Sequence, residues 1–185
     1  MTQTFYMVEM DYPDRTEADR ADYDAFYDRH ISMLLSIDGF LSAQRFRTEH
    51  AARAPYLAIY RVRDKGVLTS EAYTSKAGRM SVAPEFRASM TNWDRNLVET
   101  DASAGDAGAG CLAAPVAPGV QLVVIDRVTA DAPPLPEGFR ALEVVGLDRT
   151  IAERGARTGL GEDVADRDGW IVRRFRSLGP VRTPA

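Results

Sequence analysis

His30 is the side chain of this sequence whose chemistry best suits proton transfer. An imidazole titrates near pH 6.5, so it can accept and donate a proton at neutral pH without a large change in its pKa. Tyr27 and Tyr23 precede it by three and seven residues, a spacing that places all three side chains along one face of an α-helix. There the phenols could orient the imidazole or stabilise an enolate-like oxyanion. We take these three residues as the catalytic candidates, against the alternative that all three are core side chains.

Four further side chains could hold a substrate beside His30. Arg45 and Arg47 alternate on one face of a predicted strand, and a guanidinium next to a pocket can bind a carboxylate through two parallel hydrogen bonds. Tyr73 and Trp93 offer flat aromatic walls with a polar edge. The alternatives are solvent exposure or ion pairing for the arginines, and ordinary packing for the aromatic residues.

Metal and nucleotide chemistry find little support in the sequence. The chain has one cysteine, Cys111, and two histidines, which excludes a cysteine cluster and leaves a zinc site dependent on carboxylates. Asp24 and Asp28 are expected on a solvated helix face away from His30, and His50 in an exposed loop. No Gly-x-Gly-x-x-Gly, Walker, Gly-x-Ser-x-Gly or His-Glu-x-x-His motif occurs. We expect no metal and no cofactor.

Charge and hydropathy restrict the class of partner. The formal net charge is -4 and the basic residues form no block. The sequence therefore predicts no basic surface that would bind a phosphate backbone, and nucleic acid is not expected as a partner. No apolar run approaches the roughly 20 residues that cross a bilayer, and the N-terminal residues lack the pattern of a secretory leader. We expect a cytoplasmic protein without a membrane partner.

The elements that must position His30 follow from the apolar pattern. Residues 4–11 predict a strand closed by Tyr-Pro, and Thr16 opens a helix with a capping box and an apolar stripe that includes His30. The resulting order is β-α-β-β-α-β, that of a ferredoxin-like α+β fold. The other expected strands are residues 40–48, 56–63 and 91–99, and the other helical segments are residues 67–77 and 84–90.

The chain beyond residue 100 looks like a reduced copy of what precedes it. An Ala-, Gly- and Pro-rich stretch predicts a linker, and strand patterns then recur at 120–128, directly after Gly138, and at 170–178. Too few residues precede Gly138 for a long helix, so we expect one His30 site per chain. The predicted organisation is a ferredoxin-like α/β-barrel domain over 1–100, a linker over 101–119, and a degenerate second repeat, mainly strands, over 120–185.

An antiparallel sheet with helices on one face leaves its other face uncovered. In the second strand, alternation predicts Phe40, Ser42, Gln44 and Phe46 on one of these faces. The uncovered face can pack against the second half of the same chain, a second molecule, or both in turn. We expect a homodimer, with a small hydrophobic molecule bound in the space between sheet and helix.

The segment FYDRHISMLLSIDGFLSAQRFR resembles the signature of the EthD-like dimeric α/β-barrel proteins, in which an aromatic-x-x-His helix leads through a Gly-Phe turn into a strand. YLAIYRV, VLTSEAY and NWDRNL resemble the following strand, helix and tail in that group, so the resemblance covers residues 4–99. It implies a ferredoxin-like dimeric α/β-barrel and a histidine, here His30, that acts in an apolar cavity without a flavin or nicotinamide fold. Ile31-Ser32-Met33 follow His30 where many relatives have a proline, a departure that bears on the orientation of the imidazole.

That superfamily includes lactone isomerases, polyketide cyclases, aldoxime dehydratases and small monooxygenases, so the fold does not fix the reaction. The leading hypothesis is a cofactor-independent lyase, isomerase or cyclase. It would act by proton transfer on a small hydrophobic cyclic or aromatic carbonyl compound, with His30 as general base or acid. Two alternatives stay open: a non-catalytic binding or accessory protein of the same fold, and a small oxygenase, with or without haem.

Overall fold

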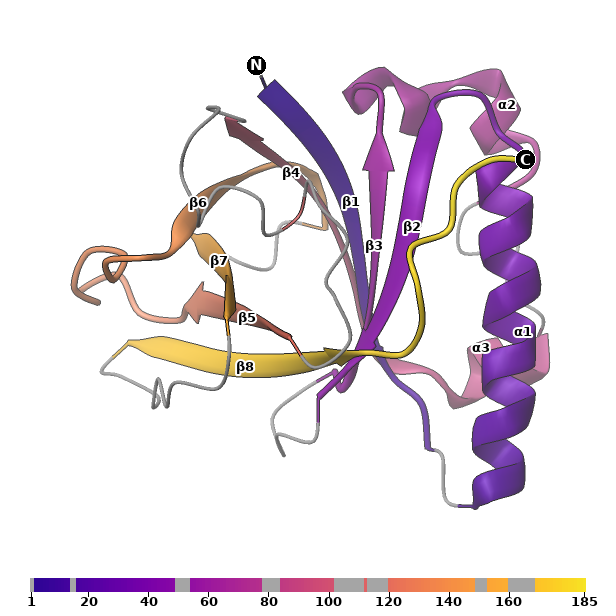
Figure 1. The fold of residues 1–185 in the computed structure, drawn as a ribbon, viewed down its shortest axis with the longest axis horizontal. Helices are drawn as coiled ribbons and strands as arrows, with labels where there is room; N and C mark the ends of the chain where they lie inside the picture. The colour runs from indigo at the N-terminus through magenta and orange to yellow at the C-terminus, as the bar shows by residue number, and fades with distance from the viewer. Residues whose placement is uncertain are drawn as a thin grey trace.

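The protein is an eight-stranded antiparallel barrel with a long helix packed against one side of it (Figure 1). The computed structural model describes residues 2–13, 16–48, 54–77, 84–101, 112, 120–148, 153–159 and 169–185. In chain order the elements are β1 (Thr2–Asp11), α1 (Glu17–Leu35), β2 (Phe40–Arg47), β3 (Tyr56–Val62), the 3-10 helix η1 (Lys65–Thr69), α2 (Glu71–Thr74), α3 (Pro84–Ser89), β4 (Thr91–Asp101), β5 (Gln121–Arg127), β6 (Arg140–Leu147), β7 (Arg154–Gly159) and β8 (Trp170–Ser177).

The two halves of the chain contribute sheets of the same strand order. The first half gives β4-β1-β3-β2 and the second gives β8-β5-β7-β6, so each reads 4-1-3-2 when its strands are numbered from its own start. The sheets join at two seams, where β2 pairs with β8 and β4 pairs with β6. The face that the first sheet leaves uncovered is therefore closed by the second half of the same chain.

The predicted fold class is confirmed in part. Antiparallel sheets and two unequal, β-rich halves are present, but the molecule is mostly β with few helices, and its barrel closes within one chain. The α+β ferredoxin-like dimer is thus not confirmed, and a homodimer stays a prediction. Of the predicted linker, residues 102–111 and 113–119 lie outside the described residues.

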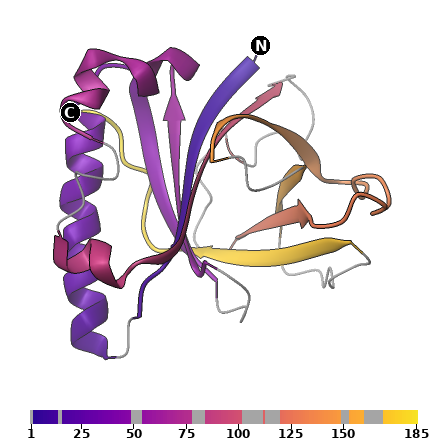
Figure 2. The same ribbon diagram turned by 180° about the vertical axis from the view of Figure 1, so that it is seen from behind.

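α1 begins with the predicted capping box. Thr16 Oγ1 accepts a hydrogen bond from the Asp19 backbone N–H at 3.0 Å, and Asp19 Oδ2 accepts one from the Thr16 N–H at 3.0 Å. These bonds satisfy two donors that the helix itself leaves unpaired. The helix lies along the outer surface of β1, β2 and β3, on the side away from the second half (Figures 1 and 2). Its buried residues are Tyr23, Phe26, Tyr27, Ile31, Leu34 and Leu35.

The second half differs from the prediction by one strand. β7 has the sequence RGARTG, in which two glycines and two arginines hide the apolar alternation that would mark a strand. Among the described residues after 120 no helix occurs, as the short spacing before Gly138 predicted. In the first half, the helix expected over 67–77 is instead divided into η1 and α2. No helix in the described part of the chain is long and apolar enough to cross a membrane.

Two apolar layers share the strands of the first sheet. On β1, Tyr6, Val8 and Met10 face α1, whereas Phe5 and Met7 face the barrel interior. This division follows from the alternation of side chains along a strand. The interior is filled by side chains from both halves, so it is a packed core. The inner layer comprises Phe5, Met7, Phe46, Leu57, Ile59, Val98, Leu122, Val124, Leu142, Ala156 and Phe175.

A buried ion cluster occupies part of the barrel interior. Arg154 Nη2 lies 2.9 Å from Glu9 Oε2, Arg154 Nε lies 2.6 Å from Asp126 Oδ1, and Arg173 Nη2 lies 2.7 Å from Glu9 Oε1. Arg173 also pairs with Asp126. Burial alone would raise the pKa of Asp126, but the charges of Arg154 and Arg173 outweigh it and hold that pKa below its ordinary value. The four residues form a neutral network that we call the ion quartet.

Phe40 lies on the face opposite to the predicted one. The pairing of β2 with β3 shifts between Phe40 and Ser42, and this bulge turns Phe40 toward α1, where it packs in the outer layer. Gln44 and Phe46 keep the register of the other face, and Phe46 reaches the barrel interior. A strict alternation was therefore wrong only at the first residue of the strand.

Gly39 has the left-handed backbone that its place after α1 requires. Its φ is +96°, and a Cβ there would lie 2.5 Å from Val67 Cγ2. We expect Gly39→Ala to lower the free energy of unfolding by about 1–3 kcal/mol, as measured by urea denaturation. Gly146→Ala is the control, because its added Cβ would meet Leu97 at an ordinary 3.6 Å. Equal stability of the two variants would contradict the expected strain.

Candidate active site between α1 and the first sheet

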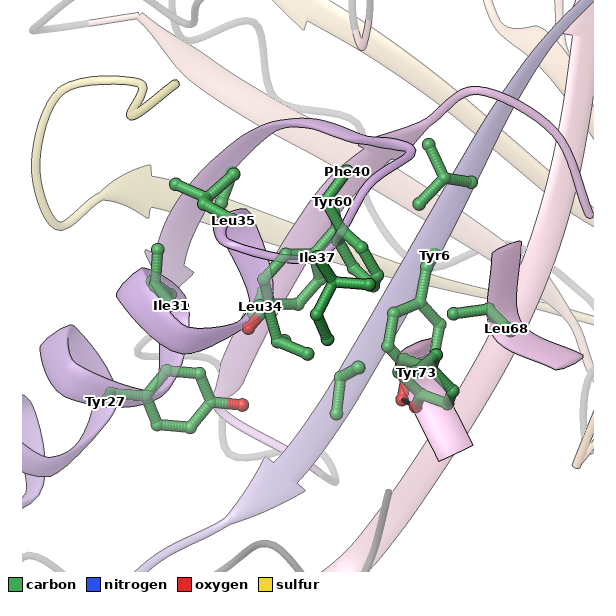
Figure 3. Packing of buried hydrophobic residues seen from close by; sticks show 14 of the residues in the cluster. Tyr6, Tyr27, Ile31, Leu34, Leu35, Ile37, Phe40, Tyr60, Leu68 and Tyr73 are labelled. Atoms are coloured by element: carbon green, nitrogen blue, oxygen red, sulfur yellow. Dashed lines mark hydrogen bonds between the residues drawn. The ribbon is translucent and has the colours of Figure 1, made fainter. Parts of the chain in front are cut away.

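A small cavity lies beside His30, between α1 and the outer face of the first sheet. Its volume is about 20 Å³, close to that of a single water site. α1, β1, α2 and β4 all contribute side chains to it, so it depends on how four elements of the first half pack together. Figure 3 shows Tyr27 on α1, with Tyr6 and Tyr73 across the same cluster. The lining residues are Tyr6, Val8, Met10, Phe26, Tyr27, His30, Leu34, Tyr73, Met90 and Trp93.

His30 points into this aromatic space, as the helical stripe predicted. Its ring stacks on Phe26 at 5.8 Å between centroids and meets the edge of Tyr27 at 5.7 Å. Loss of water around the imidazole lowers the pKa of His30 from 6.5 to about 4, so His30 is neutral at pH 7. Within the described residues it makes no hydrogen bond. The predicted alternative, a core histidine bound to backbone or to a tyrosine, does not appear among those residues.

Phenol groups surround the cavity in their neutral form. The Tyr27 hydroxyl lies 3.6 Å from Met10 Sδ, and the Tyr73 hydroxyl donates to the Tyr6 hydroxyl at 3.4 Å. Burial raises the pKa of Tyr27, and burial followed by the nearby Tyr73 raises the pKa of Tyr6. Each phenol therefore stays protonated at neutral pH and remains a hydrogen-bond donor. Donors of this kind can stabilise an oxyanion that develops beside them.

Tyr23 lies outside the cavity that His30 and Tyr27 line. Its ring stacks on Tyr12 at 4.2 Å and meets Tyr27 at 5.4 Å, edge to face. Burial is the main cause of the raised pKa of Tyr23, and the nearby Tyr27 phenol adds to it. It contacts the candidate site through the Tyr27 and Phe26 rings, both of which line the cavity. The structure thus places Tyr27 at the cavity and Tyr23 one layer behind it.

The four predicted binding residues divide between two regions. Tyr73 and Trp93 line the cavity beside His30. Arg45 and Arg47 do not: the Arg45 guanidinium lies 4.5 Å from the centre of the Tyr27 ring, on β2, and Arg47 lies 5.6 Å from the centre of the Tyr56 ring. Both arginines face α1 from β2, which confirms their predicted common face and separates them from His30.

The prediction that Asp24 lies on a fully solvated helix face is wrong. Its Oδ1 lies 2.8 Å from Arg45 Nη2, and its side chain is 41% exposed. Asp28 is 67% exposed and pairs with Arg182 at 3.3 Å, in keeping with the prediction. Among the described residues, no group of three or more His, Cys, Asp or Glu side chains comes together as a metal site. His50 and Cys111 lie outside the described residues.

Tyr6, Met10 and Met90 belong to the site but were not among the predicted candidates. A signal for two of them was present, because Tyr6, Val8 and Met10 alternate along β1 and must share one face. That this face is the one covered by α1 could not be read from β1 itself. Met90 precedes β4 in a position with no regular pattern around it.

No family model matches the chain, and no curated protein matches its sequence. Two solved structures resemble it over its full length. The crystal structure of an anthrone oxidase-like protein aligns with a TM-score of 0.53 at 11% identity, over 100% of this chain and 94% of that one. The structure of a "putative monooxygenase from Lactobacillus acidophilus NCFM" aligns with a TM-score of 0.48 at 11% identity, over 100% and 98%. At 11% identity, the alignment with the anthrone oxidase-like protein shows that the two chains share a fold over nearly their full lengths.

Proposed function

We propose that this protein is an enzyme that acts on a small hydrophobic cyclic or aromatic carbonyl compound by proton transfer, with His30 as the proton acceptor. The observation that carries the proposal is the state of His30: a neutral imidazole, without a hydrogen bond to any described residue, on the wall of an aromatic cavity. A general base needs an unprotonated acceptor atom within reach of the substrate.

The low pKa of His30 fits a reaction that creates negative charge. Removal of a proton from carbon next to a carbonyl leaves an enolate, whose oxygen carries the charge. The enolate raises the pKa of the adjacent His30 imidazolium. Protonated His30 is therefore favoured when the enolate forms, and neutral His30 is favoured in the free enzyme. The Tyr27 hydroxyl is the proposed donor to the enolate oxygen, since it lines the same cavity.

Entry of a substrate requires the cavity to widen, because about 20 Å³ holds no more than a water molecule. We propose that Trp93, which is only partly buried, and Met90 give way to the substrate. The chain has two tryptophans, and Trp170 is buried in the second half, where its Nε1–H donates to the Pro133 carbonyl at 2.8 Å. In Trp170→Phe, fluorescence therefore reports on Trp93 alone.

A small oxygenase is the second candidate, favoured by the fold shared with an anthrone oxidase-like protein. The same deprotonation would begin that reaction, and O₂ would then oxidise a methylene to a carbonyl, with its second oxygen atom leaving as water. Consumption of O₂ separates the two candidates. A porphyrin would need the cavity of about 20 Å³ beside His30 to widen far more than a small cyclic substrate does, so no step is assigned to haem.

The test is turnover of a panel of cyclic ketones, lactones and polyketide-like acids, with and without O₂, together with NMR detection of deuterium exchange at the carbon next to the carbonyl. His30→Ala should lower the rate at least about a hundredfold. Tyr23→Phe is the matched control, because it removes a hydroxyl that does not line the cavity. Equal rates in wild type and His30→Ala would overturn the catalytic role and leave a binding protein of the same fold.

A further inference from the structure

A second and larger recess lies on the other side of α1 from the His30 cavity. Its volume is about 450 Å³, within the range of sites for small molecules. α1 forms one wall, β2 forms the floor, and the C-terminal segment after β8 forms the other wall. We call this recess the tail groove. Its lining includes Arg29, Ile31, Arg45, Leu178, Pro180 and Arg182.

The tail groove exists because β2 and β8 pair only briefly. The seam between them has two register pairs, Phe46 with Ser177 and Arg47 with Arg176. The chain then runs on beside β2: the Leu178 N–H donates to the Arg45 carbonyl at 2.9 Å, and Ala43 and Arg182 exchange two backbone hydrogen bonds at 2.9 and 2.8 Å. Figure 1 shows this C-terminal segment passing from β8 along β2 toward α1.

The tail is also fastened to α1 by a side chain. Arg182 Nη1 donates to the Asp28 carbonyl at 3.1 Å, and Nη2 donates to Ser32 Oγ at 2.6 Å. The tail is thus fixed to the strand by its backbone and to the helix by Arg182. These attachments fix the position of the tail relative to α1 and β2, and the space between them is the recess.

The charges around the tail groove favour an anion. Arg29 is exposed and makes no ion pair or hydrogen bond with another described residue. Arg45 is only 9% exposed and is held between the Tyr27 ring and Asp24. Arg182 pairs with Asp28. Three guanidinium groups thus face two carboxylates, Asp24 and Asp28, and one positive charge is left over.

We propose that the tail groove binds a small amphipathic monocarboxylate, a carboxylate joined to an apolar ring or short chain. Guanidinium groups bind carboxylates through directed, charge-assisted hydrogen bonds. Leu178, which is 43% exposed, and Pro180 supply the accessible apolar surface, whereas Ile31 lines the recess but is only 2% exposed. The site is separate from the His30 cavity, because the Tyr27 ring stands between them, and it does not rest on the proposed function.

The test uses 3-phenylpropionate as the probe and neutral 3-phenylpropionamide as its control, with binding followed by isothermal titration calorimetry. The carboxylate should bind and the amide should bind at least about tenfold more weakly. Arg29→Gln should weaken binding of the carboxylate about tenfold, since it removes the unpaired charge without touching the core. Affinity should also fall with added salt.

Two variants locate the binding. Arg20→Gln changes an exposed arginine on α1 outside the tail groove and should leave the affinity unchanged. His30→Ala should also leave it unchanged. Failure of the carboxylate to bind, equal binding of the amide, or a loss of binding in His30→Ala with none in Arg29→Gln would each overturn the proposal.

Discussion

Replacement of Arg154 by methionine should lower the free energy of unfolding by about 3–5 kcal/mol, the usual cost of breaking a buried charge pair from one side. The Arg154 side chain is fully buried and bonds to both Glu9 and Asp126. Its removal leaves two carboxylates with Arg173 as their remaining partner in the quartet. A methionine fills similar volume but offers no hydrogen-bond donor, so the loss comes from the uncompensated charge and not from a cavity.

Urea denaturation at pH 7 measures this effect, and Arg157→Met is the matched control on the same strand. Arg157 lies three residues further along β7, is partly exposed, and contacts the Phe139 ring at 5.1 Å. Its replacement should cost less than about 1 kcal/mol. If Arg154→Met does not fold, Glu9→Gln is the second variant, because it removes one of the two negative charges of the quartet. Its free energy of unfolding is measured in the same way. Wild-type stability in Arg154→Met would show that the quartet contributes nothing.

Acidification should destabilise the wild-type protein through His30. The folded-state pKa of His30 is about 4, below the 6.5 of an unfolded chain, so between these pH values the unfolded state binds more protons. Stability therefore falls as the pH drops from about 6.5 to about 4. A difference of that size corresponds to about 3 kcal/mol at 1.36 kcal/mol per pKa unit.

His30→Asn should remove this part of the acid dependence. Urea denaturation at several pH values between 7 and 4 gives the difference between wild type and variant, in which the titration of the carboxylates cancels. The sequence predicts His50 to be exposed, so His50→Asn is the control and should leave the wild-type slope in place. A wild-type slope in His30→Asn would mean that the imidazole is not desolvated in the folded protein.

Much of the first half could be predicted because local signals agreed with the tertiary structure. Thr16 and Asp19 form the expected capping box, and the stripe of α1 that carries His30 is buried as its spacing required. Gly39 lies four residues after the end of α1, in the turn that leads to β2, and has the positive φ that an Asp-Gly pair suggests. In each case the residues that decide the structure lie within one or two turns of each other.

The parts that could not be predicted depend on partners far apart in the sequence. Nothing in RGARTG marks β7 as a strand, because its edges and its burial are supplied by β5 and β6. Arg154 would be expected on the surface by residue type, and its place in the interior depends on Asp126 and Glu9, which precede it by 28 and 145 residues. The bulge that turns Phe40 toward α1 is likewise a property of its pairing with β3.

The candidate site, like the fold, could be predicted from the sequence only in part. His30, Tyr27, Tyr73 and Trp93 meet at one cavity, although they come from three separate elements. Arg45 could not be placed from sequence, since the strand face that it shares with Arg47 leads to the tail groove and not to His30. Adjacency along a strand thus fixes the face but not the recess to which a side chain belongs.

The composition of the ion quartet decides which sheets can pair to close a barrel. The first half supplies one acid, Glu9, and the second half supplies Asp126, Arg154 and Arg173. Two first halves would bring two Glu9 carboxylates together without a cation from the quartet, and two second halves would enclose four arginines with two acids. Both like pairings carry buried net charge, and only the unlike pairing is neutral. The interior charges therefore favour the pairing of a first half with a second half, within one chain or between two, over the pairing of two like halves.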